Sequence, residues 1–422
     1  MYDHTKQYRC TIIRGKSQKE MDDLLPAYAK VIDEICPCRH EEFEQLFNNA
    51  FQRFLPESER VKKTLDNHRT EISGKLFGMY FFSEDGVVYE SERTQKYLND
   101  NDQPAFFKDI CYKMQFPNGM QKTSTTVAQR VEDGINIRPN AFIIKLLQIA
   151  ETARVKITKR ELGYYVLNSL DVLQGNASPY EVLEVISQDQ YNGIERDITV
   201  PGKALSYTHQ HINEQINYLE LANLIRVTED KRVLLNPNEK AAIEKFTIAY
   251  DLQPEFNVYA YELRDSDTRK KFQFDWDAYY GRLSPCADYF ATSPEALIYT
   301  DVKKAQDSTG NPDKADKMNR AEFVKYIEVK STKRLTCPDI DDPLWIDTLN
   351  LTRNEWIAAK QHKGYYAIYR VFFTRDGVTI FVIRNVAEKI DDGRIQATPM
   401  TYRVDFSNSS VDKKITLGNE VK

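Results

Sequence analysis

A carboxylate and an amine stand two residues apart in the stretch Tyr326-Ile327-Glu328-Val329-Lys330-Ser331-Thr332. In a strand, residues i and i+2 project from the same face, so we expect Glu328 and Lys330 to emerge side by side. Ile327 and Val329 are predicted to face the opposite way, into a core. A carboxylate beside a lysine suits metal-assisted phosphodiester hydrolysis, in which one group holds the cation and the other steers or activates the attacking water. Because Glu-X-Lys also occurs by chance in charged proteins, the surrounding chain decides what it means.

The composition indicates a protein of several domains with a normal core. The chain has 422 residues, of which 41% are hydrophobic and 29% charged. This length accommodates about three domains of ~150 residues each. The formal net charge of -5 argues against a coat-like nucleic-acid binder, whose affinity comes from a basic surface. A site-specific DNA enzyme remains compatible with this charge, because it needs positive charge only locally.

The chain carries no signal for membrane insertion, export, a zinc site or ATP binding. It has no run of ~18 apolar residues, and its N-terminus lacks the apolar core of a signal peptide. The close pair Cys36-Pro37-Cys38 lacks the second pair that a zinc site requires. No glycine-rich loop of the kind that cradles phosphates is present. We therefore expect a cytoplasmic protein with reduced thiols and no contact with a membrane.

A helix followed by a hairpin is predicted in the first part of the chain. Residues 58–77 form a polar, partly basic segment, and β-rich runs at 79–82 and 87–89 flank Asp85-Gly86, which favours a tight turn. This is the layout of a winged helix. A solvated helix beside an ordinary hairpin is the alternative. The candidate DNA contacts of this unit are Lys62, Lys63, Asn67, His68 and Arg69.

The same layout recurs between residues 209 and 250. A helix over 209–224 has an apolar stripe and a polar side, and two short strands at 224–227 and 232–235 follow it. A further helix is predicted to end near Tyr250. Asn, Gln and Arg read bases by paired hydrogen bonds, so the polar side is a candidate for DNA contact, with a solvated face as the alternative. Its candidate residues are His209, Gln210 and Asn213.

Three further local signals concern the helices. Pro26 interrupts a helical pattern over 17–35, which predicts two short helices or a kink. Residues 91–130 are polar and are predicted to be rich in loops. Thr158 and Glu161 have the spacing of a capping box and predict a helix start.

The order of elements around Glu328 gives that stretch its context. Asp288 precedes a predicted strand start, and the polar run 303–320 is read as an exposed loop. After the Glu328 strand, Thr352 and Glu355 form a second capping box, and strands are predicted at 365–373 and 378–383. The resulting order is a strand with an aspartate, a strand with Glu-X-Lys, a helix and a strand.

This order resembles the PD-(D/E)XK nuclease superfamily, and within it a type II restriction endonuclease. The resemblance covers about residues 285–385 and rests on the blocks 327–332, 351–356 and 365–371. Together these blocks also resemble the NO VEIN-type nuclease-like domain, a branch of the same superfamily. It implies Mg²⁺ held by Asp288, Glu328 and the backbone carbonyl of Val329. It also implies that Lys330 orients or polarises the attacking water. The gap between Asp288 and Glu328 is longer than is usual in the family, which leaves the upstream acid open.

Several alternatives stay open at this stage. Asp301 and Lys303 form an Asp-X-Lys triplet, so the triad could be Asp288, Asp301 and Lys303, or Asp301 could replace Asp288 beside Glu328. Glu328 and Lys330 could also form a surface ion pair on an edge strand. Gln361 and Tyr365 have a spacing seen in some relatives, although Gly364 between them favours a structural role.

We predict an α+β protein with a helical, winged-helix-like DNA-recognition half and a C-terminal α/β PD-(D/E)XK domain with a mixed central sheet. The expected domains are 1–130, a second winged-helix-like domain at 131–250, and the nuclease domain at 251–422. The predicted function is site-specific hydrolysis of double-stranded DNA with Mg²⁺, by a homodimer at least on DNA, beside a cognate DNA methyltransferase. The alternatives are a DNA-binding regulator without activity, a repair or junction nuclease, and a modification-dependent nuclease.

Overall fold

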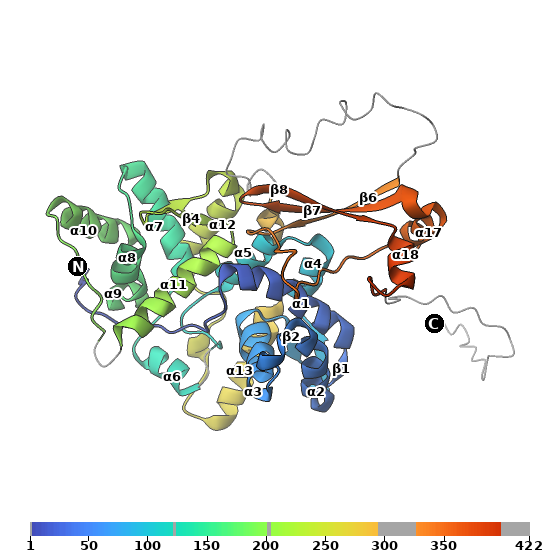
Figure 1. Cartoon of the computed structure of the whole chain (residues 1–422). Helices are drawn as coiled ribbons and strands as arrows, with labels where there is room; N and C mark the ends of the chain where they lie inside the picture. Colours follow the sequence, from blue (N-terminus) through green and yellow to red (C-terminus); the bar gives the residue numbers. More distant parts are fainter. Residues whose placement is uncertain (1, 121–123, 201–203, 294–325, 398–422) are drawn as a thin grey trace, which may run out of the picture. The chain divides into compact units, whose positions relative to one another are not determined.

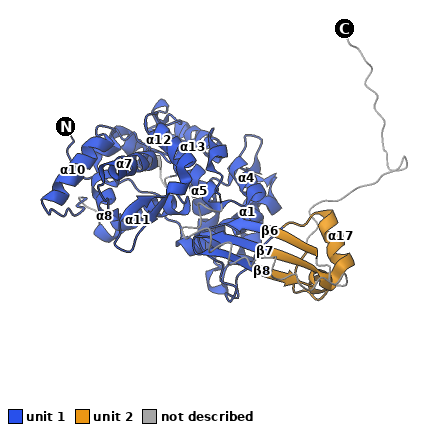
Figure 2. Ribbon diagram, turned by 90° about the horizontal axis from the view of Figure 1, so that it is seen from above, with its two compact units in different colours: residues 1–318, 330–349, 370–381 blue, residues 319–329, 350–369, 382–422 orange. Residues whose placement is uncertain are grey.

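The computed structural model describes residues 2–120, 124–200, 204–293 and 326–397 (Figure 1). The architecture is α+β, with a helical N-terminal region and a C-terminal sheet, as predicted. Within these ranges, no helix is both long and apolar enough to cross a membrane. The chain divides into two compact units (Figure 2). Unit 1 comprises Met1–Met318, Lys330–Leu349 and Arg370–Phe381, and unit 2 comprises Asn319–Val329, Asn350–Tyr369 and Val382–Lys422.

The first helix, α1 (Gln18–Ile35), is one helix although it contains Pro26. Ser17 and Glu20 form a capping box that satisfies N–H groups of its first turn. Its apolar face is buried on both sides of the proline, at Met21 and Tyr28 among others. The alternative of two short helices is therefore wrong, because packing of this face outweighs the hydrogen bond that the proline removes.

The predicted first hairpin is confirmed and belongs to a three-stranded antiparallel sheet. The strand order is β1-β3-β2, and Phe82 lies opposite Val88 across the turn at Gly86. Gly86 has a φ of +76°, which a glycine adopts without strain. The elements of this part are β1 (Cys38–Arg39), α2 (His40–Phe51), η1 (Gln52–Phe54), η2 (Glu57–Glu59), α3 (Lys62–Asp66), η3 (Asn67–Leu76), β2 (Tyr80–Phe82) and β3 (Val87–Glu90).

Residues 91–130 contain three helices, so the loop-rich prediction for them is wrong. They are α4 (Glu92–Asp100), α5 (Gln103–Lys113) and α6 (Ser124–Glu132). All eleven residues of α5 are buried, including Lys108 and Asp109. A helix that is covered on every side shows no amphipathic period, and its buried charges make it read as exposed.

The middle of the chain is helical and contains the second helix–hairpin unit, as predicted. The capping box of Thr158 and Glu161 is present at α8, and β4 pairs antiparallel with β5 so that Ile225 lies opposite Leu235. The helix predicted to end near Tyr250 ends there. The elements are α7 (Pro139–Ala153), α8 (Lys159–Glu161), η4 (Leu162–Leu167), α9 (Leu170–Leu173), α10 (Pro179–Tyr191), α11 (Leu205–Leu221), β4 (Ile225–Val227), β5 (Val233–Leu235), η5 (Pro237–Glu239) and α12 (Lys240–Tyr250).

The segment after α12 packs into the same core as the N-terminal helices. Trp276 on α13 (Ser266–Gly281) is fully buried, and a Cβ atom at Gly119 would lie 2.3 Å from its ring. Only glycine therefore fits at position 119. Two short 3-10 helices, η6 (Val258–Ala260) and η7 (Ala287–Phe290), flank α13.

A buried arginine joins α13 to α4 and α5. The Arg93 guanidinium donates to Asp109 Oδ2 at 2.7 Å and to the carbonyl oxygens of Phe77 at 2.6 Å and Tyr280 at 2.7 Å. It also lies 4.5 Å from the centre of the Tyr280 ring, a favourable cation–π distance. Asp109 accepts a second bond, from the Ser284 N–H. Four segments that are distant in sequence are thus held by one side chain.

The C-terminal sheet has the strand order β6-β7-β8. Thr352 and Glu355 form the predicted capping box at the start of α17, and the two predicted strands after that helix are present. The elements are β6 (Tyr326–Lys333), α17 (Arg353–His362), η9 (Lys363–Tyr365), β7 (Tyr366–Thr374), β8 (Gly377–Arg384) and α18 (Val386–Asp391).

Asp277 on α13 is an acid that burial makes harder to ionise. Burial raises the pKa of Asp277 from 3.8 to about 6, although its carboxylate accepts a bond from Gln273. The stabilising contribution of such a group is complete below its ordinary pKa and is lost as the pH rises through about 6. Asp277→Asn is therefore expected to raise the free energy of unfolding by about 1–2 kcal/mol at pH 8 and to leave it unchanged at pH 4.

Urea denaturation at the two pH values measures this difference. Asp275→Asn is the control, since Lys271 pairs with that carboxylate and the pKa of Asp275 is lowered instead. It should not stabilise the protein at pH 8. An equal effect of Asp277→Asn at both pH values would contradict the assignment.

Candidate functional site

Helix α11 presents its predicted DNA contacts to solvent. His209, Gln210 and Asn213 are all exposed, whereas Ile212 and Ile216 are buried. The amphipathic pattern placed these three side chains correctly, and their contact with DNA stays a prediction. The polar side is not wholly solvated, because Gln215 on the same helix is buried.

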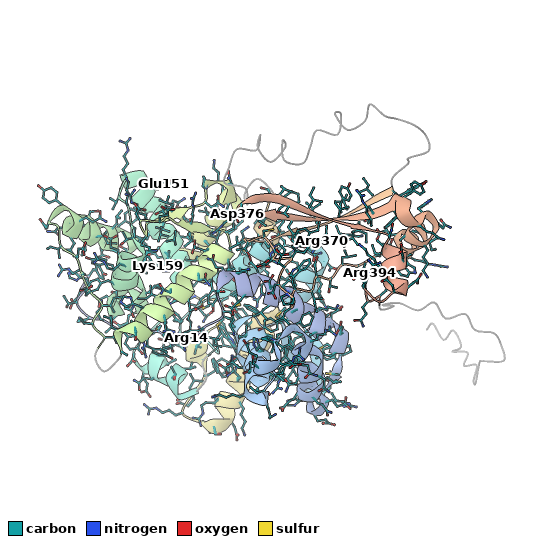
Figure 3. All side chains as sticks on the ribbon, in the orientation of Figure 1. Arg14, Glu151, Lys159, Arg370, Asp376 and Arg394 are labelled. Atoms are coloured by element: carbon teal, nitrogen blue, oxygen red, sulfur yellow. The ribbon has the colours of Figure 1, made fainter. Side chains whose placement is uncertain are left out.

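Two arginines from the segment before α1 lie beside this face. Arg14 donates a hydrogen bond to Oε1 of Gln210, and the position of Arg14 is labelled in Figure 3. The guanidinium carbons of Arg9 and Arg14 lie 4.8 and 5.1 Å from the centre of the Tyr207 ring. Tyr207, on the first turn of α11, is 40% exposed. The N-terminal segment thus adds two cations and an aromatic ring to the predicted contact face.

Several donors in this cluster are buried without a protein partner. Nε and Nη1 of Arg9 and Nη1 of Arg130 have no hydrogen-bond acceptor among the described residues. Arg130 is only 2% exposed, and its Nη2 donates to the Thr11 carbonyl at 2.8 Å. Buried N–H groups normally have an acceptor, so these unsatisfied donors set the arginines of this cluster apart from ordinary structural arginines.

His211 on α11 lies among these arginines. Burial and the charges of Arg9, Arg14 and Arg130 lower the pKa of His211 to about 4. The ring is therefore neutral at pH 7, and its Nδ1 accepts from the Ile12 N–H at 3.3 Å. Its proton then lies on Nε2, which is another buried donor without a partner in the described chain. We call Arg9, Arg14, Arg130, Tyr207 and His211 the arginine cluster.

The arginine cluster was missed by sequence reasoning. Arg9 and Arg130 are separated by more than a hundred residues, so no local pattern unites them. The available signal was the basic run Lys6, Arg9, Arg14 and Lys16 ahead of α1, which has no apolar period of its own.

The first predicted DNA-contact set is only partly exposed. Lys62, Lys63 and Asn67 are exposed, and Lys62 pairs with Glu44 and Asp66. The prediction for His68 and Arg69 is wrong, since both are buried. His68 is hydrogen-bonded to the Tyr28 hydroxyl, and Arg69 pairs with Glu44 at 3.1 Å and Asp66 at 3.0 Å. Their burial and their bonds to other side chains do not suit a direct contact with DNA.

The two faces of β6 differ from the prediction. Glu328 and Lys330 are both half-buried, which fits two side chains on the same face of a strand. Ile327 and Val329 are 46% and 57% exposed. The expectation that Ile327 and Val329 face a core is therefore wrong. Within unit 2, the His362 ring from the end of α17 stacks on the Tyr326 ring with 3.7 Å between centroids. Tyr326 alternates with Glu328, so α17 reaches the face of the acid and not that of the isoleucine.

Arg370 on β7 holds the part of β6 that follows Val329. Its guanidinium donates to the Lys330 carbonyl at 3.3 Å and to Thr332 Oγ1 at 2.9 Å. The same group pairs with Asp347 at 2.5 Å. Arg370 is buried and is labelled in Figure 3. It fixes the backbone at Lys330, a role that sequence reasoning did not recognise although Arg370 lies in one of the conspicuous blocks.

Asp288, the expected upstream acid, does not precede a strand in the structure. Asp288 lies exposed on η7, a 3-10 helix, so the expected strand start at Tyr289 is wrong. The turn Ser284-Pro285 leads into this helix because the Ala287 N–H bonds back to the Ser284 carbonyl. Asp301 and Lys303 lie outside the described residues. Among those described, no group of three His, Cys, Asp or Glu side chains could hold a metal ion.

Gln361 and Tyr365 are both exposed, one on α17 and the other on η9. Their predicted structural role is thus not one of filling a core.

Comparison with known proteins gives three findings. Residues 2–277 match the sequence model of the family described as restriction endonuclease BpuJI, N terminal. Residues 301–383 match that of the protein NO VEIN C-terminal domain. A crystal structure of pyrene- and phenanthrene-modified DNA in complex with the BpuJ1 endonuclease binding domain is 49% identical, with a TM-score of 0.64. The match covers 67% of this chain and 100% of that one.

No curated protein matches the chain. The first family match nevertheless spans more than half of the sequence, and it is supported by the solved structure over a similar length. The second match covers β6, α17 and β7, the elements on which the resemblance to nucleases rested. The chain therefore belongs to the BpuJI N-terminal family and is a type II restriction endonuclease-like protein.

Proposed function

We propose that this protein is a site-specific DNA endonuclease of the restriction type. Its helical region binds double-stranded DNA, and its C-terminal region hydrolyses phosphodiester bonds with Mg²⁺. The observation that carries the proposal is the arginine cluster beside the exposed face of α11. A related domain, 49% identical, has been solved in complex with DNA. Two winged-helix units and a PD-(D/E)XK nuclease domain are the folds proposed for these regions.

The arginine cluster suits the DNA backbone because it gathers positive charge beside the exposed face of α11, and because Arg14 itself is exposed. Phosphate oxygens accept hydrogen bonds from guanidinium groups, and such contacts position a protein on the duplex. His209, Gln210 and Asn213 project beside the cluster and have side chains that can contact base edges. The net charge of -5 is no obstacle, since the cations needed are gathered at one place.

Arg14→Ala is expected to weaken DNA binding without unfolding the protein. Arg14 is exposed and bonds to Gln210, so its removal deletes a cation from the surface and not from the core. We expect a loss of affinity of about tenfold, similar for all sequences, and a salt dependence of log K that is shallower by about 1. Fluorescence anisotropy with a labelled duplex at several salt concentrations measures both.

Arg394→Ala is the matched control for charge. Arg394 lies in an exposed pair with Asp392 in unit 2 and is not part of the arginine cluster. It should leave affinity and salt slope unchanged. An unchanged slope for Arg14→Ala would exclude a phosphate contact at Arg14.

For the nuclease region, Glu328 and Lys330 are the proposed catalytic residues. Glu328 supplies one carboxylate, and the backbone carbonyl of Val329 follows it. The described residues do not complete a magnesium site by themselves, because Asp288 lies exposed on a 3-10 helix and no third acid is grouped with Glu328. Asp301 stays the alternative upstream acid. Mg²⁺ bound there would supply Lewis-acid activation of the scissile phosphate.

Digestion of plasmid DNA separates the possible functions. Methylated and unmethylated supercoiled plasmids are incubated with the full chain and Mg²⁺, with EDTA as the control, and the ends are mapped. Discrete ends from unmethylated DNA support a restriction enzyme with a partner methyltransferase, and discrete ends from methylated DNA alone support a modification-dependent nuclease. Cleavage of branched DNA only supports a repair nuclease. Binding without cleavage supports a regulator.

Cutting both strands requires two active sites, so we propose that the protein acts as a homodimer at least on DNA. Sedimentation velocity with and without a duplex measures this directly. A monomer on DNA that still makes double-strand breaks would contradict it. A cytoplasmic location is proposed as well.

A further inference from the structure

The C-terminal end of α11 is capped by an arginine from the C-terminal sheet. Arg375 lies in the turn between β7 and β8, next to Asp376, which Figure 3 labels. Its Nη2 donates to the carbonyl oxygens of Glu220 at 2.9 Å and Ile225 at 3.1 Å. Its Nη1 lies 3.7 Å from Glu220 Oε1. A guanidinium at the last turn of a helix satisfies its free carbonyls and complements the negative end of its dipole.

Glu220 itself is firmly positioned. Its Oε1 accepts from the Val227 N–H at 3.1 Å, and its Oε2 accepts from Gln18 Nε2 at 3.2 Å. It therefore joins α11 to β4 and to the start of α1. A movement of α11 changes the place at which Arg375 is held.

The turn that carries Arg375 is also bonded to the end of β6. The Arg375 N–H donates to the Leu335 carbonyl at 3.2 Å, and the Arg334 N–H donates to the Phe373 carbonyl at 3.0 Å. Arg370 lies on β7, five residues before Arg375, and donates a hydrogen bond to the Lys330 carbonyl. All of these residues belong to unit 1. The backbone of β7 between Arg370 and Arg375 thus joins the hydrogen bonds at the end of α11 to those at the Lys330 carbonyl.

We propose that Arg375 is a positioning residue that relays DNA occupancy of α11 to β6. This rests on the proposed function, in which α11 contacts DNA through His209, Gln210 and Asn213. Asn213 and Glu220 are seven residues apart, or about 10 Å along one rigid helix. When α11 shifts on the duplex, Glu220 moves with the helix and Arg375 follows Glu220. The β7–β8 turn then moves with Arg375 and adjusts the position of the strand that holds Lys330.

The relay adds a specificity step to the proposed nuclease. DNA that binds loosely leaves α11 and Arg375 in place, while the recognised sequence alone shifts them and adjusts Lys330. An interaction of this kind changes the rate of cleavage and the response of β7, and it changes DNA affinity only by the small coupling energy between α11 and Arg375. A contact that only stabilises the fold would instead change the melting temperature of the free and the DNA-bound protein by the same amount.

The test is hydrogen exchange of the full chain with and without a 30-bp duplex, selected from a randomised library by binding to the wild-type protein. In the wild type, DNA is expected to slow exchange of the amides at 370–375 by about fivefold or more. Arg375→Ala should reduce this response to less than about twofold, while its affinity for the duplex stays within about threefold of the wild type. Arg394→Ala is the control with the same loss of charge.

Glu220→Gln is a second variant that keeps the shape of the Glu220 side chain. Arg375→Lys is the conservative variant, because a lysine can still donate to the Glu220 carbonyl, and it should keep part of the exchange response that Arg375→Ala loses. A full response in Arg375→Ala overturns the relay, and so does an affinity loss above about tenfold, since Arg375 would then support the DNA site itself. Wild type that binds without any response at 370–375 also overturns the relay, whereas failure to bind DNA overturns the proposed function.

Discussion

Glu328→Gln is expected to abolish DNA cleavage, by about 10³-fold or more, while leaving DNA affinity unchanged. The glutamine amide has the shape of the acid but no charge, so it cannot hold a divalent cation or balance charge at the scissile phosphate. Glu328 is half-buried on β6, and the proposed DNA contacts lie on α11. Cleavage of plasmid under single-turnover conditions, together with anisotropy for binding, measures the two effects separately.

Val329→Ala is the matched control for this prediction. The Val329 side chain is exposed, and its proposed ligand atom is a backbone carbonyl that the substitution keeps. It should cut at the wild-type rate. Lys330→Ala should lose cleavage as Glu328→Gln does. Normal cutting by Glu328→Gln and Lys330→Ala in Mg²⁺ would show that the active site lies elsewhere. If these variants lose cleavage, an unchanged melting temperature excludes unfolding as the cause of the loss.

Arg93→Ala is expected to lower the free energy of unfolding by about 3–5 kcal/mol. Arg93 is 1% exposed and binds Asp109 and the carbonyls of Phe77 and Tyr280. Its loss leaves a buried carboxylate and two buried carbonyls without their donor, and it opens a cavity beside the Tyr280 ring. Guanidinium denaturation followed by tryptophan fluorescence suits the measurement, because Trp276 stacks on Tyr280 at 5.3 Å.

Two comparisons decide whether burial is the cause. Lys271→Ala removes a cation from the exposed pair with Asp275 and should change stability by less than about 0.5 kcal/mol. Arg93→Met with Asp109→Leu removes both charges, and should cost less than Arg93→Ala alone because no unpaired charge stays buried. A loss below about 1 kcal/mol in Arg93→Ala would mean that the network contributes little to the fold.

Features determined by neighbouring residues were predictable from the sequence. The capping boxes at Thr158 and Thr352 need only two residues three positions apart, and both are present. Both N-terminal hairpins follow from β-rich runs on either side of a turn, and both pair as expected. The exposed side of α11 followed from helical period alone.

Features that depend on distant contacts were not predictable. The charges of α5 read as solvated, yet Lys108 is fully buried and pairs with Glu239 at 2.8 Å. His68 and Arg69 looked like ligand contacts, but Tyr28 and Glu44 engage them from other helices. In each case the partner lies more than twenty residues away, where no pattern of spacing can reveal it.

The candidate site shows the same division. The order of strand, capped helix and strand after Glu328 was visible in the sequence and is present. The faces of β6 were assigned from the apolar character of Ile327 and Val329, which the fold leaves exposed. The arginine cluster unites the N-terminal segment with α6 and α11, so only the assembled structure reveals it.

The way in which Arg93 ties α13 to α4 and α5 determines where the DNA-binding region can be separated from the rest. A fragment ending at the predicted boundary of 250 would lack Tyr280 and Trp276, and would expose the side chains that they cover. Lys108 extends the requirement, because it bonds to the Phe290 carbonyl and Thr292 Oγ1. A recognition module for crystallisation or for fusion to another effector should therefore extend at least beyond Thr292.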